Sequence, residues 1–118
     1  MTRGMIDRMC FSPDGKSVVL LLRQGIEIWN AADMSVRVPR FPVPDAPWTF
    51  AIHPKASYFA ATNATRDLTF YKLDTGAPLQ EFEFRLGEWT RSVAFAPDGS
   101  SCAACGTENR FAVIEVDR

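Results

Sequence analysis

A five-residue turn motif that returns at near-constant spacing constrains this chain more than any other feature. The sequence Phe-Ser-Pro-Asp-Gly occupies 11–15, and Phe-Ala-Pro-Asp-Gly repeats it at 95–99. A divergent copy, Ile-His-Pro-Lys-Ala, lies between them at 52–56, so that the three prolines are 41 and 43 residues apart. A period of about 40 residues indicates a repeat architecture, in which each motif marks one structural unit. The motif itself predicts a type I turn, because proline presets φ at the second position and glycine is favoured at the fourth.

Short apolar or alternating segments surround each turn and predict an all-β protein. Ser17–Leu22 is an apolar run with β-branched residues, which is typical of a strand covered on both faces. In Ser35–Arg40, valines alternate with Arg37, and Pro39 limits the segment to an edge strand. Within a unit we expect two buried strands, then an alternating strand, then an edge strand. The predicted strands are Met5–Phe11, Ser17–Leu22, Ile26–Trp29 and Ser35–Arg40 in the first unit, Trp48–Ile52, Tyr58–Thr62, Leu68–Leu73 and Glu81–Leu86 in the second, and Arg91–Phe95, Ser101–Cys105 and Phe111–Val116 in the third.

The bulk composition excludes several classes of function. At 118 residues the length allows one domain or part of one, and a net charge of −1 gives no long-range attraction to nucleic acid or to an anionic membrane. The longest aliphatic run has five residues, far fewer than the roughly 20 that span a bilayer. The N-terminal ten residues lack the apolar core of a signal peptide. With three cysteines and no export signal, the chain is expected to carry free thiols in the cytoplasm.

Four strands per unit, a period near 42 and a Ser-Pro-Asp-Gly turn after the first strand resemble the WD-repeat β-propeller family. The dipeptide that names the family ends its third strand, and Trp29-Asn30, Tyr71-Lys72 and Ile114-Glu115 occupy that place here. Gly87-Glu88 stands where the family has Gly-His, without the histidine. The polar network of the family is therefore not assembled, and the resemblance implies blades held by apolar stacking. It predicts blade 1 at about 5–41, blade 2 at about 47–86 and blade 3 at about 89–118, each blade being a four-stranded antiparallel sheet and the last lacking its outer strand.

Two full blades and three strands of another cannot close a propeller ring, which typically has 4–8 blades. The family often lets its N-terminus supply the last outer strand, but this would need about a dozen residues before Asp7, where six are present. We therefore expect Phe111–Val116 to remain an outer edge and both end blades to expose an apolar face, which favours association. Copies assembled head-to-tail would complete the ring, two giving six blades and three giving nine. The alternative is a fragment of a longer propeller.

Residues that could carry chemistry are few. Cys102 and Cys105 form a C-x-x-C, but on a strand this spacing places the two side chains on opposite faces, so we expect small buried side chains rather than a metal or redox site. Cys10 is likewise predicted to pack. His53, the single histidine, is expected to bond local backbone in its turn, and no acid or nucleophile accompanies it. Glu81 and Glu83 alternate with phenylalanines and predict a solvated outer face. We expect no catalytic residue, metal or cofactor.

Loop residues on one rim are the remaining candidates for function. Propellers similar to this chain bind partners on the rim formed by the loops after the second and fourth strands. Aromatic residues and arginine on loops are favoured at protein-binding hot spots. The two tryptophans of this set begin first strands, so packing between blades is the alternative to partner contact. The resemblance implies a non-catalytic protein–protein interaction scaffold, with a purely structural fragment and a propeller-class enzyme of quinoprotein or lactonase type as alternatives. The candidate rim residues are Phe41, Trp48, Arg66, Glu88, Trp89 and Arg110.

Overall fold

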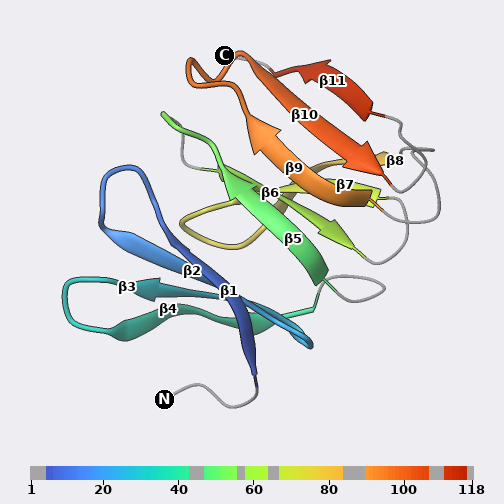
Figure 1. Cartoon of the computed structure of the whole chain (residues 1–118). Helices are drawn as coiled ribbons and strands as arrows, with labels where there is room; N and C mark the ends of the chain where they lie inside the picture. The colour runs from blue at the N-terminus through green and yellow to red at the C-terminus, as the bar shows by residue number, and fades with distance from the viewer. Residues whose placement is uncertain are drawn as a thin grey trace.

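The computed structural model describes residues 5–42, 47–55, 58–63, 67–83, 90–106 and 111–116, and the side chains of these residues except 47, 48, 63, 67, 81–83, 90 and 91. Eleven strands form three antiparallel sheets, stacked from the bottom to the top of Figure 1. The first sheet has the order β1 (Ile6–Phe11), β2 (Ser17–Leu22), β3 (Gly25–Asn30), β4 (Ser35–Phe41). The second has the order β5 (Pro47–Ile52), β6 (Tyr58–Asn63), β7 (Asp67–Lys72), β8 (Pro78–Glu83). The third has the order β11 (Phe111–Glu115), β10 (Ser101–Gly106), β9 (Thr90–Phe95).

The recurring motif forms the turn that joins the first two strands of its sheet. In the first copy, Gly15 N–H donates to the Ser12 carbonyl oxygen at 2.9 Å, and Ser12 N–H donates to the Ser17 carbonyl oxygen at 2.8 Å. The third copy has the same two bonds, from Gly99 to Ala96 and from Ala96 to Ser101, both 2.9 Å long. The prediction of a turn at both places is confirmed. Gly15 and Gly99 have φ values of 74° and 77°, a region that side chains disfavour and glycine adopts freely.

Strand register is equivalent in the three sheets. Ser17 pairs with Asn30, Tyr58 with Lys72, and Ser101 with Glu115. The dipeptides that resemble the family signature therefore occupy one common register position. Because side chains alternate between the faces of a strand, equivalent positions in the three sheets point toward equivalent faces. We call the face turned toward the following sheet the forward face and the opposite one the backward face.

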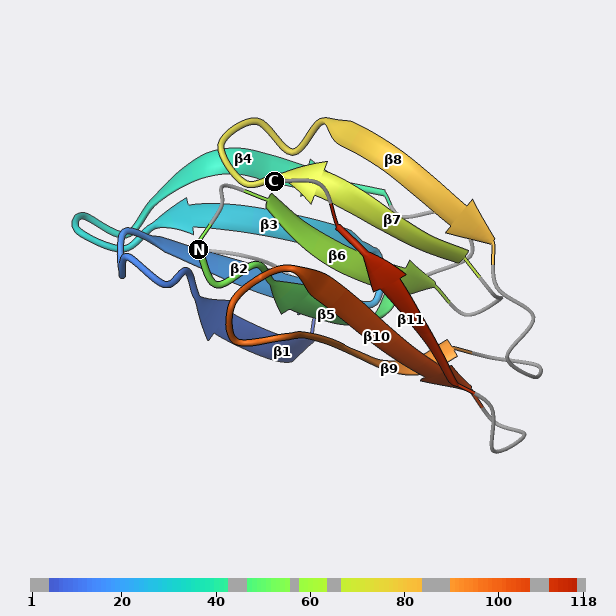
Figure 2. The same cartoon turned by 90° about the horizontal axis from the view of Figure 1, so that it is seen from above.

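Most of the core lies in the two junctions between consecutive sheets, and a smaller cluster lies on the backward face of the first sheet. In the first junction, the forward face of the first sheet packs against the backward face of the second, and in the second junction the second sheet packs against the third in the same way. In the view from above, the third sheet lies over β5 and β6 (Figure 2). Buried residues of the first junction are Val19, Leu21, Ile26, Ile28 and Val38 against Phe50, Phe59, Ala61, Tyr71 and Leu73. Those of the second are Ala60, Leu68 and Phe70 against Val93, Cys102 and Val116.

Two expectations about the strands are corrected. Every predicted strand is present, but β8 begins at Pro78, three residues before the predicted Glu81, since proline is tolerated as the first residue of an edge strand. Residues 84–86 of the predicted alternating segment, and the side chains of Glu81 and Glu83, lie outside the described part of the chain. The first strand of the first unit was expected to be buried, yet β1 is exposed throughout, because no sheet covers it.

Candidate interaction surfaces

The forward face of the third sheet exposes positions that are buried in both other sheets. Phe111 pairs with Cys105 in β10, and Val113 pairs with Ala103. These two large side chains are 72% and 61% exposed. At the equivalent positions, Ile26 and Ile28 of the first sheet are fully buried, as is Leu68 of the second sheet, and Phe70 is 6% exposed. The third sheet thus carries the same apolar pattern as its neighbours, without a sheet packed on it.

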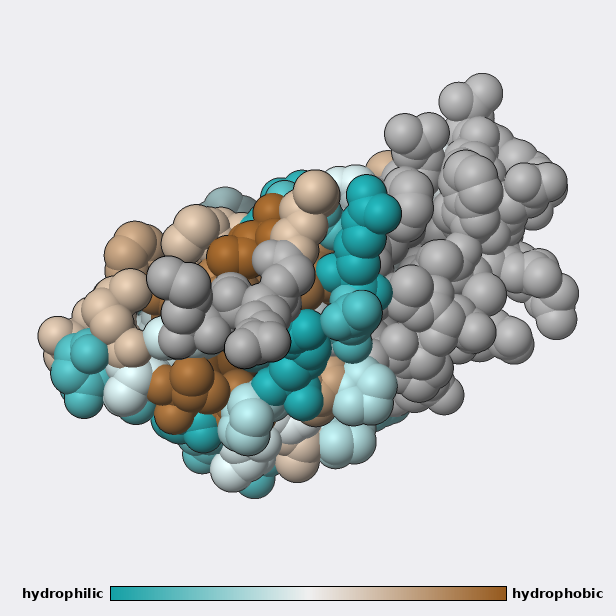
Figure 3. All heavy atoms as spheres, turned by 90° about the horizontal axis from the view of Figure 1, so that it is seen from below, coloured by the Kyte–Doolittle hydropathy of each residue, from teal (hydrophilic) through white to brown (hydrophobic). Residues whose placement is uncertain are grey.

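The backward face of the first sheet is exposed along β1 and buried along β2. Met9 and Phe11 pair with Leu20 and Val18, and they are 62% and 61% exposed. Leu20 and Val18 are buried in a small cluster with Leu22, against which Trp29 and Ala31 pack. In the view from below, on the side of the first sheet, apolar surface (brown) is interleaved with polar surface (teal) (Figure 3). At the positions equivalent to Met9, Phe50 and Val93 are buried in the two junctions.

An ion pair between buried Glu27 and partly exposed Arg40 lies on the outer half of this backward face. The Glu27 carboxylate accepts from Trp29 Nε1 through Oε1 and from Arg40 Nε through Oε2, both at 2.9 Å. Arg40 also donates to Gln24 Oε1 at 2.9 Å. A buried carboxylate is tolerated only when its oxygens are bonded in this way.

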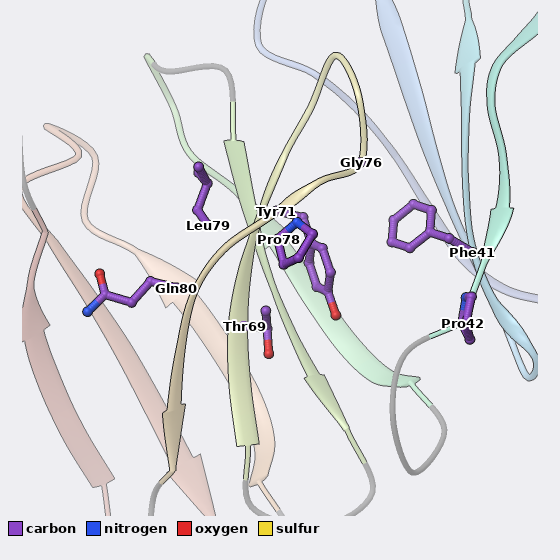
Figure 4. Close-up of a pocket in the computed structure, with 8 residues that line it drawn as sticks. All are labelled: Phe41, Pro42, Thr69, Tyr71, Gly76, Pro78, Leu79 and Gln80. Atoms are coloured by element: carbon purple, nitrogen blue, oxygen red, sulfur yellow. The ribbon is translucent and has the colours of Figure 1, made fainter.

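A groove of about 580 Å³ opens between the end of β4 and the outer strands of the second sheet. In Figure 4, Phe41 and Pro42 come from the end of β4 and the residue after it, while Tyr71 and Pro78 of the second sheet lie nearest to them and Leu79 points away. The Phe41 ring lies 5.4 Å from the Tyr71 ring, centroid to centroid, in a tilted arrangement. Among the described residues that line the groove, none is charged. Phe41, predicted as a rim residue, therefore packs partly between the first two sheets.

The other predicted rim residues are less fully described. Trp48 lies on β5, and its side chain is outside the described part of the chain, as are Arg66, Glu88, Trp89 and Arg110 altogether. Their role in partner binding stays a prediction.

His53 links the second sheet to the third. Lys55 N–H donates to its Nδ1 at 3.0 Å, so the ring proton is on Nε2, which donates to the Gly99 carbonyl oxygen at 2.9 Å. The ring also lies 4.7 Å from that of Tyr58 and 5.1 Å from that of Phe95, and the residue is 7% exposed. The predicted local bond is confirmed, whereas the bond to Gly99 was not predicted. No sequence signal marks that bond, because its two residues are 46 positions apart.

The cysteines separate as the strand spacing predicts, but only one of them is buried. Cys102 is fully buried, and burial raises the pKa of its thiol to about 11, so that it carries no thiolate at neutral pH. Cys105 and Cys10 are exposed, which makes the expectation of packing wrong for both. Cys10 lies on β1, which makes no extensive contact with the second sheet, whereas Cys105 lies on the forward face of the third sheet, on which no described sheet packs.

Within the described ranges, no three of the His, Cys, Asp and Glu side chains come together as a group that could hold a metal ion. The same ranges contain no helix that is long and apolar enough to cross a membrane.

No family model and no curated protein matches this sequence. Among solved structures, the chain is similar to Kuenenia stuttgartiensis hydrazine synthase, with a TM-score of 0.82 at 18% sequence identity. The similarity covers 98% of this chain and 35% of that chain, so this chain spans about a third of the protein it resembles. At this identity the likeness concerns the fold alone. Together with the three antiparallel sheets, it identifies the fold as all-β and β-propeller-like, with consecutive sheets as blades.

Proposed function

We propose that this chain is a non-catalytic protein-interaction scaffold built from WD-like blades, working as part of a closed propeller. The observation that carries the proposal is the equivalence of the sheet faces. Phe111 and Val113 are exposed at register positions where the first two sheets bury Ile26, Ile28, Leu68 and Phe70. Exposed apolar patches of this kind mark association sites.

The residues at the place of the family's signature dipeptide support the WD-like character of the blades. Trp29, Tyr71 and Ile114 all lie opposite the second residue of the second strand of their sheets, Val18, Phe59 and Cys102. Each packs against the backward side of its own sheet. Tyr71 and Ile114 pack in the two junctions and Trp29 packs on the backward face of the first sheet, so that apolar stacking stands in place of the family's polar network.

Solution mass and apolar-dye fluorescence test the proposal. We expect the chain either to associate or, while monomeric, to enhance the fluorescence of a dye such as ANS well above the level of a globular protein of equal size. A monodisperse monomer that neither enhances dye fluorescence nor exposes the Cys105 thiol would overturn the proposal, since its terminal faces would then be closed already.

The alternative function is that of a propeller-class enzyme, and the structural neighbour is named as an enzyme. A quinoprotein or lactonase needs metal or cofactor ligands gathered at one place. Mass spectrometry for metal content separates the two readings, because a stoichiometric metal in the purified protein would favour the enzyme.

A further inference from the structure

We infer that one end of the first sheet, where the β1–β2 and β3–β4 turns lie, binds a carboxylate group through Arg37. Both turns lie at the same end of the sheet, and the β2–β3 turn lies at the other (Figure 1 and Figure 2). The site is therefore at the opposite end from the predicted rim for partner binding. It goes beyond the proposed function, because it requires neither a second chain nor a closed ring.

A β-bulge in β4 sets the direction of the Arg37 side chain. The register between β3 and β4 shifts between Ile28 and Trp29. Their partners are Val38 and Val36, so that Arg37, between the two valines, stands opposite no residue of β3. Bulges re-aim a side chain and are frequent next to functional sites. This bulge gives a first reason to examine what Arg37 binds.

The Arg37 guanidinium is half-buried, and no described carboxylate pairs with it. Its side chain crosses β3, and Nη2 donates to Oγ of Ser17, which is buried on β2. Its Nε is buried and has no hydrogen-bond partner in the part of the chain that the structure describes. On the same strand, Arg40 is paired with Glu27. Because a cation removed from water requires a counter-charge, an anion from outside the chain would stabilise Arg37.

The Arg37 side chain lines a hollow of about 600 Å³, a volume in the usual range for small-ligand sites. The two turns that form the rest of the hollow are joined, since Ala31 N–H donates to the Lys16 carbonyl oxygen at 3.0 Å. Several lining residues have small side chains or none, which leaves room for a ligand beside the guanidinium. The lining residues from the turns are Gly15, Lys16, Asn30, Ala31, Ala32 and Asp33.

The charges at the hollow favour a ligand with a single negative charge. Lys16 and Arg37 are positive and Asp33 is negative, which leaves a surplus of one positive charge on the lining. The Ser35 hydroxyl and then the Ser35 N–H donate to Asp33 Oδ1 and lower the pKa of this carboxyl, so that it is ionised. Asp14 lies beside Lys16, whose N–H it accepts at 2.9 Å, and this leaves Arg37 as the main binding charge. A planar guanidinium matches a carboxylate, whereas the two aspartates oppose a doubly charged phosphate.

Acetate titration of the full chain, followed by amide NMR against sodium chloride at equal ionic strength, tests the site. We expect saturable shifts of the Gly15, Lys16 and Ala31 amide resonances. Arg37→Gln should weaken acetate binding by about tenfold or more, because a charge-assisted hydrogen bond is lost. Arg23→Gln is the matched control, since it removes an exposed positive charge from the β2–β3 turn and should leave the affinity unchanged. Shifts that do not saturate, or an equal affinity in Arg37→Gln, would overturn the inference.

Asp33→Asn tests the charge argument without changing Arg37, and it keeps the inference testable if Arg37→Gln does not fold. Asparagine can still accept the bonds from Ser35 through its amide oxygen. Because a repelling charge is removed, acetate binding should become about two- to threefold tighter. Unchanged or weaker binding in Asp33→Asn would overturn the assignment of the hollow as the site.

Inorganic phosphate and a peptide define the ligand. Phosphate at neutral pH should bind more weakly than acetate, and tighter binding would overturn the choice of a carboxylate. An N-acetylated, C-amidated hexapeptide with one glutamate is compared with its glutamine version. Tighter binding of the glutamate peptide than of acetate would assign the site to a protein segment, and binding of acetate alone would assign it to a small free carboxylate. Failure of the proposed function is a separate result, namely a monomer without dye fluorescence or a reactive Cys105, and it leaves this site standing.

Discussion

The first and third copies of the turn motif have the same backbone bonds but are held by different side chains. In the first copy, Ser12 Oγ donates to Asp14 Oδ1 at 2.6 Å and accepts from Ser17 N–H at 3.1 Å. The third copy has Ala96 in place of Ser12 and gains its hydroxyl from Ser100, whose Oγ donates to Asp98 Oδ1 at 2.7 Å. Its glycine carbonyl is bonded by His53 of the preceding sheet. One turn is thus stabilised within its own sheet, and the other partly by its neighbour.

The middle copy explains how the difference arises. His53 occupies the position of Ser12, and its Nδ1 accepts a backbone N–H within the turn, which is a role that a serine oxygen can also fill. An imidazole has a second nitrogen, and Nε2 extends to the next sheet. Replacing a hydroxyl by a ring therefore converts a local stabilising residue into a link between blades.

Gly99→Ala should have the largest effect and Gly15→Ala a much smaller one. A Cβ on Gly99 would lie 2.5 Å from Nε2 of His53, while a Cβ on Gly15 would meet no atom within 4 Å. Both substitutions incur the strain of a positive φ, about 1 kcal/mol, and the contact with His53 adds about 2 kcal/mol at Gly99. Urea unfolding at equal protein concentration measures the difference.

The His53→Ala background is the control for this comparison. With the ring removed, Gly99→Ala should cost about 1 kcal/mol, as Gly15→Ala does, because only the backbone strain remains. If Gly99→Ala costs the same with and without the ring, the contact between the two residues does not distinguish the two turns.

Ser12→Ala should have an intermediate effect. Ser12 is 3% exposed, and its loss leaves the buried Ser17 N–H without its hydroxyl acceptor, which costs about 1–2 kcal/mol. Ser100→Ala removes the corresponding hydroxyl of the third copy, where the bond is exposed, and should cost about 0.5 kcal/mol. The two urea midpoints decide the order, and an equal or larger loss at Ser100 would contradict the proposed difference between the turns.

The smallest effect concerns pH. The Ser12 hydroxyl and then the Lys16 N–H lower the pKa of Asp14 below its ordinary value of 3.8, and the Ser100 N–H and hydroxyl do so for Asp98. A lowered folded-state pKa contributes stability above the ordinary value, and this contribution is lost as pH falls through 3.8 toward the folded-state pKa. Unfolding midpoints measured across this acid range should fall less steeply in the Asp14→Asn and Asp98→Asn variants. Unchanged slopes in both would show that these carboxylates do not sense folding.

The positions of the strands could be predicted from sequence because the signals are local. Pro13 and Gly15 mark a turn, Ser17–Leu22 has the length and β-branching of a strand, and the odd spacing of Cys102 and Cys105 places their side chains on opposite faces of a strand. These patterns depend on residues within a few positions of one another. The start of β8 was missed, because proline is read as a strand breaker unless the strand is known to be an edge.

Burial and contacts between sheets could not be predicted in the same way. The exposure of Cys10 and Cys105 depends on whether a neighbouring sheet packs on β1 and on the forward face of β10, which no pattern within the strand reports. The bond from His53 to Gly99 likewise requires the packing of two units. The placement of Phe41 against Tyr71 depends on how the end of β4 meets the second sheet. Equivalent positions in the three sheets could be recognised only after the strand pairing of each sheet was known.

The bond between His53 and Gly99 also bears on how the chain unfolds. In an array of repeats, stability is approximately the sum of a term for each unit and a term for each pair of neighbours. A side chain rooted in one unit and bonded to the backbone of the next increases the pair term at the second junction. We expect the second and third sheets to open as one cooperative unit, with slow amide exchange in both, rather than the third sheet fraying alone from the end of the array.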